Sequence, residues 1–229
     1  MNRGRIFETQ DGSHSIFSES FGVSYHSRYG AIQESNHVFI QSGLFYRMPG
    51  ARQLSVLEIG FGTGLNALLT LREAAKRQLP VYYEAVEAYP ISVEEAKQLN
   101  YPHIIDPALA DTFALLHEGP WEEEQQLNPY FVFRKTLKRF EQVAYRDAFD
   151  VIYFDAFAPG AQPELWEEEM LGKMFDALKS NGVLTTYCAK GAVKRKLKSL
   201  GFVVEALKGP PGKREMTRAV KPAPAHPGT

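Results

Sequence analysis

The sequence has few of the residues from which stabilising cross-links and metal centres are built. Cys188 is the single cysteine among 229 residues, so no intrachain disulfide can form, and a reducing compartment is the natural setting. None of the six histidines lies at a ligand spacing from that cysteine, and H-E-x-x-H and C-x-x-C do not occur. No G-x-S-x-G supports serine chemistry. We therefore expect no metal in the site.

Long apolar segments are also lacking. No apolar run approaches the roughly 20 residues that cross a bilayer, and no basic-then-apolar signal opens the chain. These absences predict a soluble cytoplasmic protein with no membrane partner.

The charge is small in sum but unevenly distributed. The formal net charge is -1, which argues against a general nucleic-acid coat protein. Residues 84–124 nevertheless hold ten acidic residues and one lysine, whereas residues 190–221 hold ten basic residues and two acidic ones. This asymmetry favours one end that faces a polyanion. A solvated helix face with a charged tail explains the same pattern equally well.

Short apolar runs alternate with helical patterns along the chain, which predicts an α/β fold with a mostly parallel central sheet and helices on both faces. A hairpin around Asp11-Gly12-Ser13 and a helix over 30–46 form an expected N-terminal appendage, residues 1–50. The core is expected over 51–221, with an irregular acidic stretch after residue 99, and the Pro-rich tail 222–229 is expected to be disordered. Expected strands cover 54–59, 81–86, 130–133, 151–154, 183–187 and 202–206, and expected helices cover 65–76, 92–99, 163–178 and 192–200.

The most informative segment is Glu58-Ile59-Gly60-Phe61-Gly62-Thr63-Gly64, where a predicted strand becomes a helix. Glycines allow a sharp turn and close approach of a cofactor, and the helix offers free N–H groups. The dinucleotide pattern G-x-G-x-x-G has Leu65 at its third glycine when counted from Gly60, and Ala67, a tolerated variant, when counted from Gly62, so an NAD site is less favoured but stays an alternative. The pattern E-x-G-x-G-x-G instead resembles the first motif of Rossmann-like S-adenosyl-L-methionine (AdoMet) methyltransferases. A glycine-rich turn without a ligand is the alternative.

Glu87 ends the next predicted strand, about 25 residues beyond the glycine loop. An acid at this place can accept hydrogen bonds from both ribose hydroxyls of a nucleotide cofactor. An ordinary exposed acid at a strand end is the alternative.

Asp155 ends another predicted strand and opens the segment Asp155-Ala156-Phe157-Ala158-Pro159. Acid, aromatic and proline here resemble, with different spacing, the (Asp/Asn)-Pro-Pro-aromatic loop of amino-group methyltransferases. Such a carboxylate can accept hydrogen bonds from a substrate amine and help to remove its proton, which an alkylammonium must lose before it can attack a methyl group. A helix cap or a plain turn is the alternative.

The segment Gly209 to Met216 forms a rigid turn that carries Lys213 and Arg214. Two adjacent cations can bind substrate phosphates. Taken alone, an ordinary charged turn is the simpler interpretation.

Together, several segments resemble one family, the methyltransferase domain of the tRNA 5-methylaminomethyl-2-thiouridine biosynthesis protein. The resemblance runs from about residue 5 to 219 and includes Asp11-Gly12-Ser13, Tyr25-His26-Ser27, Glu34-Ser35, Glu58 to Asn66, Asp155 to Trp166 and Gly209 to Met216. It implies methyl transfer from AdoMet, leaving S-adenosylhomocysteine, to the aminomethyl group on the wobble uridine in a tRNA anticodon stem-loop. Many relatives carry a fused flavin-dependent oxidase domain, and this chain resembles the stand-alone form.

The resemblance also assigns roles to residues. It implies that Glu58, Gly60, Gly62, Gly64, Asn66, Glu87 and Glu34 bind the cofactor, that Asp155 is catalytic, and that Phe157, Pro159, Lys213 and Arg214 bind substrate. Family members often carry Gly-Asp after the third core strand, but Arg134-Lys135-Thr136 stands there in this chain. Adenine recognition is therefore expected to use the backbone or Thr136.

Two other functions are consistent with the residues. One is an AdoMet-dependent N-methyltransferase of a small amine or a protein, with the basic segment as plain surface. The other is a non-catalytic RNA-binding subunit that keeps the fold, against which the intact Glu58, Glu87 and Asp155 argue.

Overall fold

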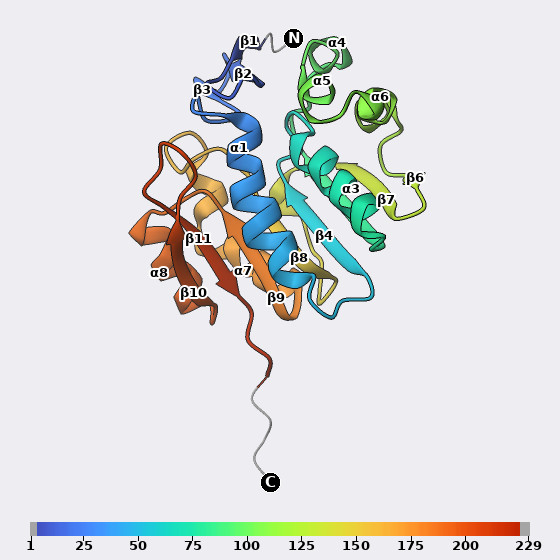
Figure 1. The fold of residues 1–229 in the computed structure, drawn as a ribbon. Coiled ribbons are helices and arrows are strands. Elements are labelled where there is room, and N and C mark those ends of the chain that lie inside the picture. Colours follow the sequence, from blue (N-terminus) through green and yellow to red (C-terminus); the bar gives the residue numbers. More distant parts are fainter. Residues whose placement is uncertain (1–3, 225–229) are drawn as a thin grey trace.

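The computed structural model describes residues 4–224 and contains two sheets (Figure 1). A small antiparallel sheet of β1, β2 and β3 lies at the N-terminus, and an eight-stranded sheet has the order β10-β11-β9-β8-β4-β5-β7-β6. The small sheet comprises β1 (Arg5–Glu8), β2 (His14–Ser18) and β3 (Val23–Ser24). The large sheet comprises β4 (Leu54–Ile59), β5 (Val81–Glu87), β6 (Glu124–Asn128), β7 (Phe131–Leu137), β8 (Phe149–Phe154), β9 (Leu178–Thr186), β10 (Val203–Lys208) and β11 (Glu215–Val220).

The middle of the large sheet is parallel, as predicted. β4 pairs in parallel with β5 on one side and β8 on the other, while β7 and β9 extend the parallel set outward. The chain fills one side first, through β4, β5 and β7, and then crosses to β8 and β9. The carboxyl ends of β4 and β8 therefore flank the point where the strand order reverses, which is the usual ligand site of such sheets.

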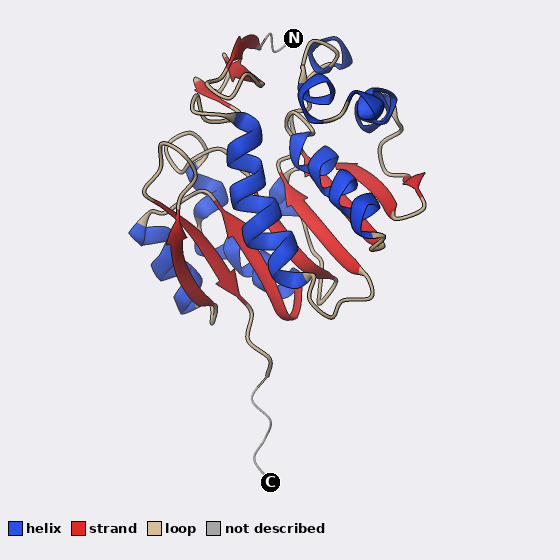
Figure 2. Ribbon diagram, viewed as in Figure 1, coloured by secondary structure: helices blue, strands red, loops and turns tan. Residues whose placement is uncertain are grey.

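Helices cover both faces of this sheet (Figure 2). A continuous helical segment leads into the core: α1 (Ala31–Ser35), the π-helical η1 (Asn36–Leu44) and α2 (Phe45–Arg47). It lies beside α3 (Leu65–Arg77), and both contribute buried side chains to one apolar cluster. The other helices are α4 (Val93–Ala96), α5 (Tyr101–Ile105), η2 (Pro107–Leu109), α6 (Ala110–Glu118), η3 (Phe140–Gln142), η4 (Pro163–Trp166), α7 (Glu168–Ala177) and α8 (Gly191–Ser199).

The other face has its own apolar cluster. Met170, Leu171 and Met174 of α7 and Leu197 of α8 pack there against the inner strands. With Val38 and Leu44 of the leading helix buried on the opposite face, the sheet is covered on both sides, and nearly all residues of its central strands β4, β5 and β8 are buried.

The secondary structure agrees with the prediction in the core and differs from it in three segments. The acidic stretch after residue 99 is not irregular, since it holds α5, α6 and the edge strand β6. The helix expected over 163–178 is divided by extended backbone at Glu167, and Leu178 already begins β9. Strand β11 was not predicted, because its sequence, EMTRAV, has neither a continuous apolar run nor a regular alternation of apolar and polar residues.

The predicted tail, 222–229, is described only as far as residue 224, over which no regular structure forms. Its remaining residues, 225–229, lie outside the described part of the chain.

Candidate active site at the carboxyl ends of the central strands

Three of the predicted segments meet where the strand order reverses. The glycine loop follows β4, Glu87 ends β5 and Asp155 follows β8. Backbone hydrogen bonds join them: Gly60 N donates to Val86 O (3.0 Å), and Asp155 N donates to Ile59 O (3.0 Å). The three segments were predicted separately, and the parallel register of β4, β5 and β8 brings them together.

The glycine loop needs its glycines for conformation and for space. Gly60 and Gly62 have φ of 93° and 50°, a region that other L-residues rarely adopt. A Cβ on Gly60 would lie 2.9 Å from the carbonyl oxygen of Asp155, and a Cβ on Gly62 would lie 2.9 Å from the ring of Tyr25. The loop is thus held between the segment after β8 and the N-terminal region.

Glu87 is buried and binds the loop directly. One carboxylate oxygen accepts from Gly62 N (2.9 Å), and the other accepts from Ala88 N and Tyr89 N (2.8 Å each). Burial raises the pKa of Glu87, whereas these backbone donors act in the opposite direction. The carboxylate has a fixed position at the strand end, where a ribose would lie.

Asp155 is joined to a second acid through an amide. Asn66 Nδ2 donates to Asp155 Oδ2 (2.9 Å) and to Glu58 Oε1 (2.8 Å), while Tyr83 OH donates to the other oxygen of Glu58 (2.8 Å). Asn66 Oδ1 has no hydrogen-bond partner within residues 4–224. It is therefore a free acceptor on a side chain that lines the pocket described below.

The pKa of Asp155 is raised well above its usual value. Burial is the main cause, the charge of Glu34 adds to it, and the Asn66 amide and Lys213 oppose it. Burial likewise raises the pKa of Glu58, with Asp155 as a second cause. A carboxylate with a raised pKa is a stronger base, which suits proton removal from an amine.

A pocket lies above these side chains. The space within it that is open to the centre of a water molecule is small, about 30 Å³. Three aromatic rings narrow it: the centroid of Phe157 lies 4.9 Å from that of Phe21 and 5.0 Å from that of Tyr25.

The pocket contains part of the predicted site. Its lining includes Gly60, Gly62, Asn66, Glu87, Asp155 and Phe157. The other predicted residues do not line it: Glu34, Glu58, Gly64, Thr136, Pro159, Lys213 and Arg214. Glu58 lies behind Asn66 with both oxygens bonded, and a Cβ on Gly64 would face His117 and Phe61.

The segment at the end of β7 turns its polar groups away from the pocket. Thr136 Oγ1 donates to Glu84 (3.1 Å), and Lys135 is buried with Nζ donating to the carbonyl oxygen of Leu116 (3.1 Å). Phe140, which follows β7, does line the pocket. The expected adenine contact of Thr136 would require this arrangement to change.

Several lining residues were not predicted. They are Phe21, Tyr25, His26, Phe61, Thr63, Leu65, Tyr89, Phe140, Ala156 and Gln162. His26 is buried, its Nε2 lies 2.8 Å from Thr63 Oγ1, and burial lowers its pKa to about 4, so the ring is neutral. Tyr25 and His26 stood in the segment Tyr25-His26-Ser27 singled out above, but only the fold brings that segment to the glycine loop.

Residues 4–224 contain no group of three or more His, Cys, Asp or Glu side chains placed to hold a metal ion. No helix in the same range is long and apolar enough to cross a membrane.

Comparison with known proteins gives consistent matches. Residues 120–222 match the model of a family described as S-adenosyl-L-methionine-dependent methyltransferase. The tRNA 5-methylaminomethyl-2-thiouridine biosynthesis bifunctional protein MnmC of Aromatoleum aromaticum is 33% identical over 96% of this chain and 37% of its own length. The protein of the same name from Burkholderia multivorans is 33% identical over 88% of this chain and 32% of its own.

Among solved structures, that of MNMC2 from Aquifex aeolicus matches with a TM-score of 0.79 and 25% identity. The match covers 100% of this chain and 74% of that one. The chain spans only about a third of the length of the curated relatives. These matches confirm the predicted resemblance, the fold class and AdoMet as the cofactor of the family.

Proposed function

We propose that this protein, a relative of the AdoMet-dependent methyltransferase part of the tRNA 5-methylaminomethyl-2-thiouridine biosynthesis proteins, methylates the aminomethyl group at C5 of the wobble uridine of tRNA. The product is a 5-methylaminomethyl-(2-thio)uridine. The meeting of Gly62, Glu87 and Asp155 at one pocket is the observation that carries this proposal. We further propose that the protein works in the cytoplasm, where its tRNA substrate would be.

The residues present fit AdoMet. The fixed carboxylate of Glu87 is placed to accept from ribose hydroxyls, and Gly60 and Gly62 line the pocket without a Cβ, so a cofactor can approach the loop backbone closely. The unpartnered Oδ1 of Asn66 can accept from an ammonium group. Gly60, Gly62, Asn66 and Glu87 are the proposed cofactor residues, with Glu58 and Gly64 supporting them from behind.

Asp155 is the proposed catalytic residue. A substrate ammonium would donate to its carboxylate beside Phe157, in a pocket narrow enough to exclude most water. Because the pKa of Asp155 is raised, the carboxylate can take the proton that frees the amine lone pair. When bound, AdoMet supplies an electrophilic methyl group on sulfur.

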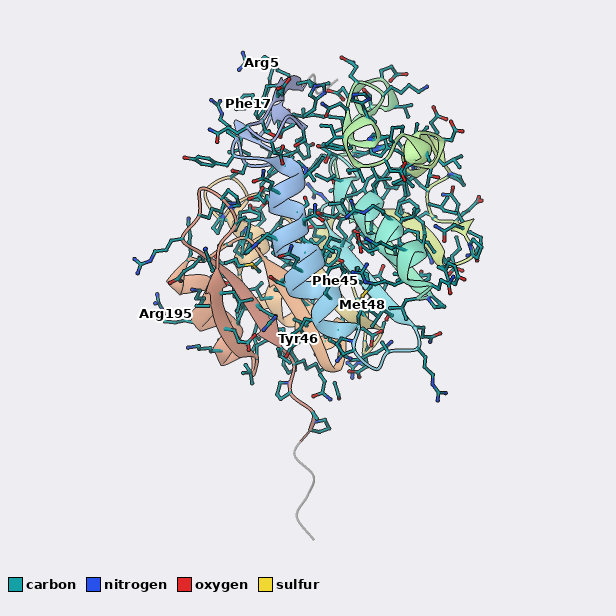
Figure 3. The ribbon with its side chains drawn as sticks, viewed as in Figure 1. Arg5, Phe17, Phe45, Tyr46, Met48 and Arg195 are labelled. Carbon is teal, nitrogen blue, oxygen red and sulfur yellow. The ribbon has the colours of Figure 1, made fainter. Side chains whose placement is uncertain are left out.

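The proposed substrate is tRNA, because both curated relatives are named for tRNA uridine biosynthesis and because a basic surface lies near the pocket. Lys190, Lys213 and Arg214 line an open cleft beside Tyr187. Arg195 of α8, labelled in Figure 3, is exposed. Such cations can hold backbone phosphates while the wobble base is turned out of its stack.

Methyl transfer from labelled AdoMet to tRNA from cells that lack this enzyme tests the proposal. Nucleoside analysis should show label in 5-methylaminomethyl nucleosides. If the protein binds AdoMet but labels a polyamine or a peptide and not tRNA, the small-amine or protein substrate is correct. Binding of tRNA without binding of AdoMet would indicate the non-catalytic subunit.

A further inference from the structure

The turn between β10 and β11 lies across the N-terminal segment. We call residues 209–214 the strap; it rises from the sheet toward the start of the leading helix (Figure 1). Gly212 has φ of 80° and lies so close to the Tyr29 ring that a Cβ would come within 2.0 Å of it. His37 Nε2 lies 2.7 Å from the carbonyl oxygen of Lys208, just before the strap. The strap is therefore packed in a defined position against the N-terminal segment.

Lys213 anchors the strap through a partly buried ion pair. Its Nζ lies 2.6 Å from Glu34 Oε1 and 3.9 Å from the centroid of the Tyr187 ring. The Glu34 side chain is 7% exposed and that of Lys213 is 32% exposed. The other Glu34 oxygen accepts from Ser27 N (2.9 Å), so the acid is fixed in place, whereas the lysine has solvent on one side.

The ion pair lies between two regions of opposite character. On the outer side is the open cleft in which Lys190 and Arg214 accompany Lys213. On the inner side, Tyr187 OH donates to the carbonyl oxygen of Ala156 (2.8 Å), the neighbour of Asp155. The charges of Glu34 and Lys213 both affect Asp155, in opposite directions. Lys213 thus lies between the open cleft, whose cations can bind a phosphate, and the two acids Glu34 and Asp155.

We propose that Lys213 exchanges partners when substrate binds: it leaves Glu34 for a backbone phosphate of the RNA, and the aminomethyl cation held by Asp155 replaces it as the positive charge near Glu34. This inference rests on the proposed function and goes beyond it, because it assigns selectivity to the Glu34–Lys213 pair. The recognised feature is a primary ammonium and a phosphate carried by one molecule.

The selectivity follows from the cost of an unpaired buried charge. A ligand with a phosphate but no ammonium must draw Lys213 from Glu34 and leave that acid without a cation, which is strongly unfavourable. A free amine without phosphate leaves the ion pair in place and gains nothing from the outer cleft. Only a ligand that carries both charges satisfies both sides.

The decisive variant is Glu34→Gln, and the probes are two short anticodon stem-loop RNAs. One carries 5-aminomethyluridine at the wobble position and is the substrate; the other carries plain uridine and serves as a competitive inhibitor. In Glu34→Gln, Lys213 is free to bind phosphate at no cost, so the plain stem-loop should inhibit about five- to tenfold more strongly than in wild type. A damaged fold cannot produce tighter binding.

Lys213→Met supplies the second measurement. It should lower kcat/KM on the modified stem-loop at least tenfold but should not lower kcat/KM on the free 5-aminomethyluridine nucleoside, which carries no phosphate and whose ammonium can take the place of the lost cation near Glu34. Lys213→Arg should restore most of the loss. Lys179→Met is the matched control, because Lys179 pairs with the half-buried Asp150 at 2.9 Å and is 40% exposed, at the amino end of β9 and away from the carboxyl ends where the pocket lies.

The outcomes separate this inference from the proposed function. If wild type methylates neither RNA nor nucleoside, the proposed function fails. If wild type methylates the modified stem-loop while Glu34→Gln binds the plain stem-loop no more tightly than wild type, the exchange of partners is wrong. An equal loss on both substrates in Lys213→Met would also overturn it, because it would show that Lys213 supports the fold or the pocket instead.

Discussion

Asp155 is the residue on which the proposed proton removal depends. Its contacts differ from those of the residue proposed to bind the ribose, so the two roles can be tested separately. Its carboxylate is held by Asn66, whereas the ribose position belongs to Glu87 on another strand. Asp155→Ala should therefore lower kcat by about 10²- to 10⁴-fold, the usual contribution of a general base. The AdoMet dissociation constant, measured by calorimetry, should change less than about threefold. If kcat falls and the AdoMet dissociation constant rises to a similar extent, Asp155 serves cofactor binding or the fold.

Substitution of Glu87 should weaken AdoMet binding, whereas substitution of Thr136 should leave it unchanged. Glu87→Ala removes the acceptor at the end of β5 and should weaken AdoMet binding about tenfold or more, which corresponds to ~1.4 kcal/mol. Thr136→Val should leave the affinity within about twofold, because the Thr136 hydroxyl donates to Glu84 outside the pocket lining. Calorimetric titration of AdoMet into both variants measures the contrast. Weaker binding by Thr136→Val would restore the adenine role expected from the sequence.

At the scale of elements, the glycine loop depends on the segments that close around it. Gly62→Ala places a Cβ against Tyr25 and requires a left-handed backbone, which costs an L-residue roughly 1–2 kcal/mol. The variant should unfold at lower urea concentration and bind AdoMet more weakly. Gly160→Ala is the control, since a Cβ there meets nothing within 4 Å. Equal stability of the two variants would contradict the packing described here.

The loop-bearing strands could be predicted because each carries its own local signal. An apolar run ending at Gly60, an acid at Glu87 and an acid at Asp155 are visible in the sequence, and parallel pairing does the rest. Tyr25 and His26 have no such signal, because their place above the loop results from contacts far apart in the chain. Strand β11 was missed for a similar reason: it is stabilised by pairing with β9 and β10 and not by a local pattern.

The boundary between the N-terminal appendage and the core, expected at residue 50, can be judged only from the tertiary structure. Val38 and Leu44 of the leading helix are fully buried in the same cluster as the first core strand. We propose that the appended unit is the small sheet alone, and that the helix from residue 31 belongs to the methyltransferase core.

At the scale of the whole molecule, the buried His26 and the half-buried His117 link stability to pH. Burial lowers the pKa of His117 to about 4, where its ring contacts Phe61 and Phe113 and its Nε2 lies 3.2 Å from Thr63 O. Since the unfolded pKa is about 6.5, the unfolded state binds more protons between pH 6.5 and 4, and the contribution of His117 to stability is lost as pH falls through this window.

His117→Phe tests that linkage. At pH 7 it should cost about 1 kcal/mol for the lost hydrogen bond, and the deficit relative to wild type should shrink or reverse, by about 2 kcal/mol, as the pH falls to 4.5. Asp155, Glu58 and Glu87, whose pKa values are raised, act in the opposite direction but are common to both proteins. Urea unfolding at each pH gives the difference, and a deficit independent of pH would show that His117 titrates normally.

The proposed tRNA substrate would contact both the basic cleft and the pocket. Of the basic residues of 190–221, Lys190, Lys213 and Arg214 line one cleft together with Glu215, and that cleft lies next to the loop that carries Asp155. Electrostatic attraction to phosphates weakens as salt is added, so binding to tRNA should fall steeply between about 50 and 200 mM salt. A small amine would show no such dependence.

The most direct test is single-turnover methyl transfer from labelled AdoMet to an anticodon stem-loop with 5-aminomethyluridine at the wobble position, in wild type and in Asp155→Ala. The account predicts one methyl group per RNA, located on the side-chain nitrogen, and almost none in the variant. Label on a ring nitrogen or a ribose oxygen, or unchanged transfer by Asp155→Ala, would contradict it.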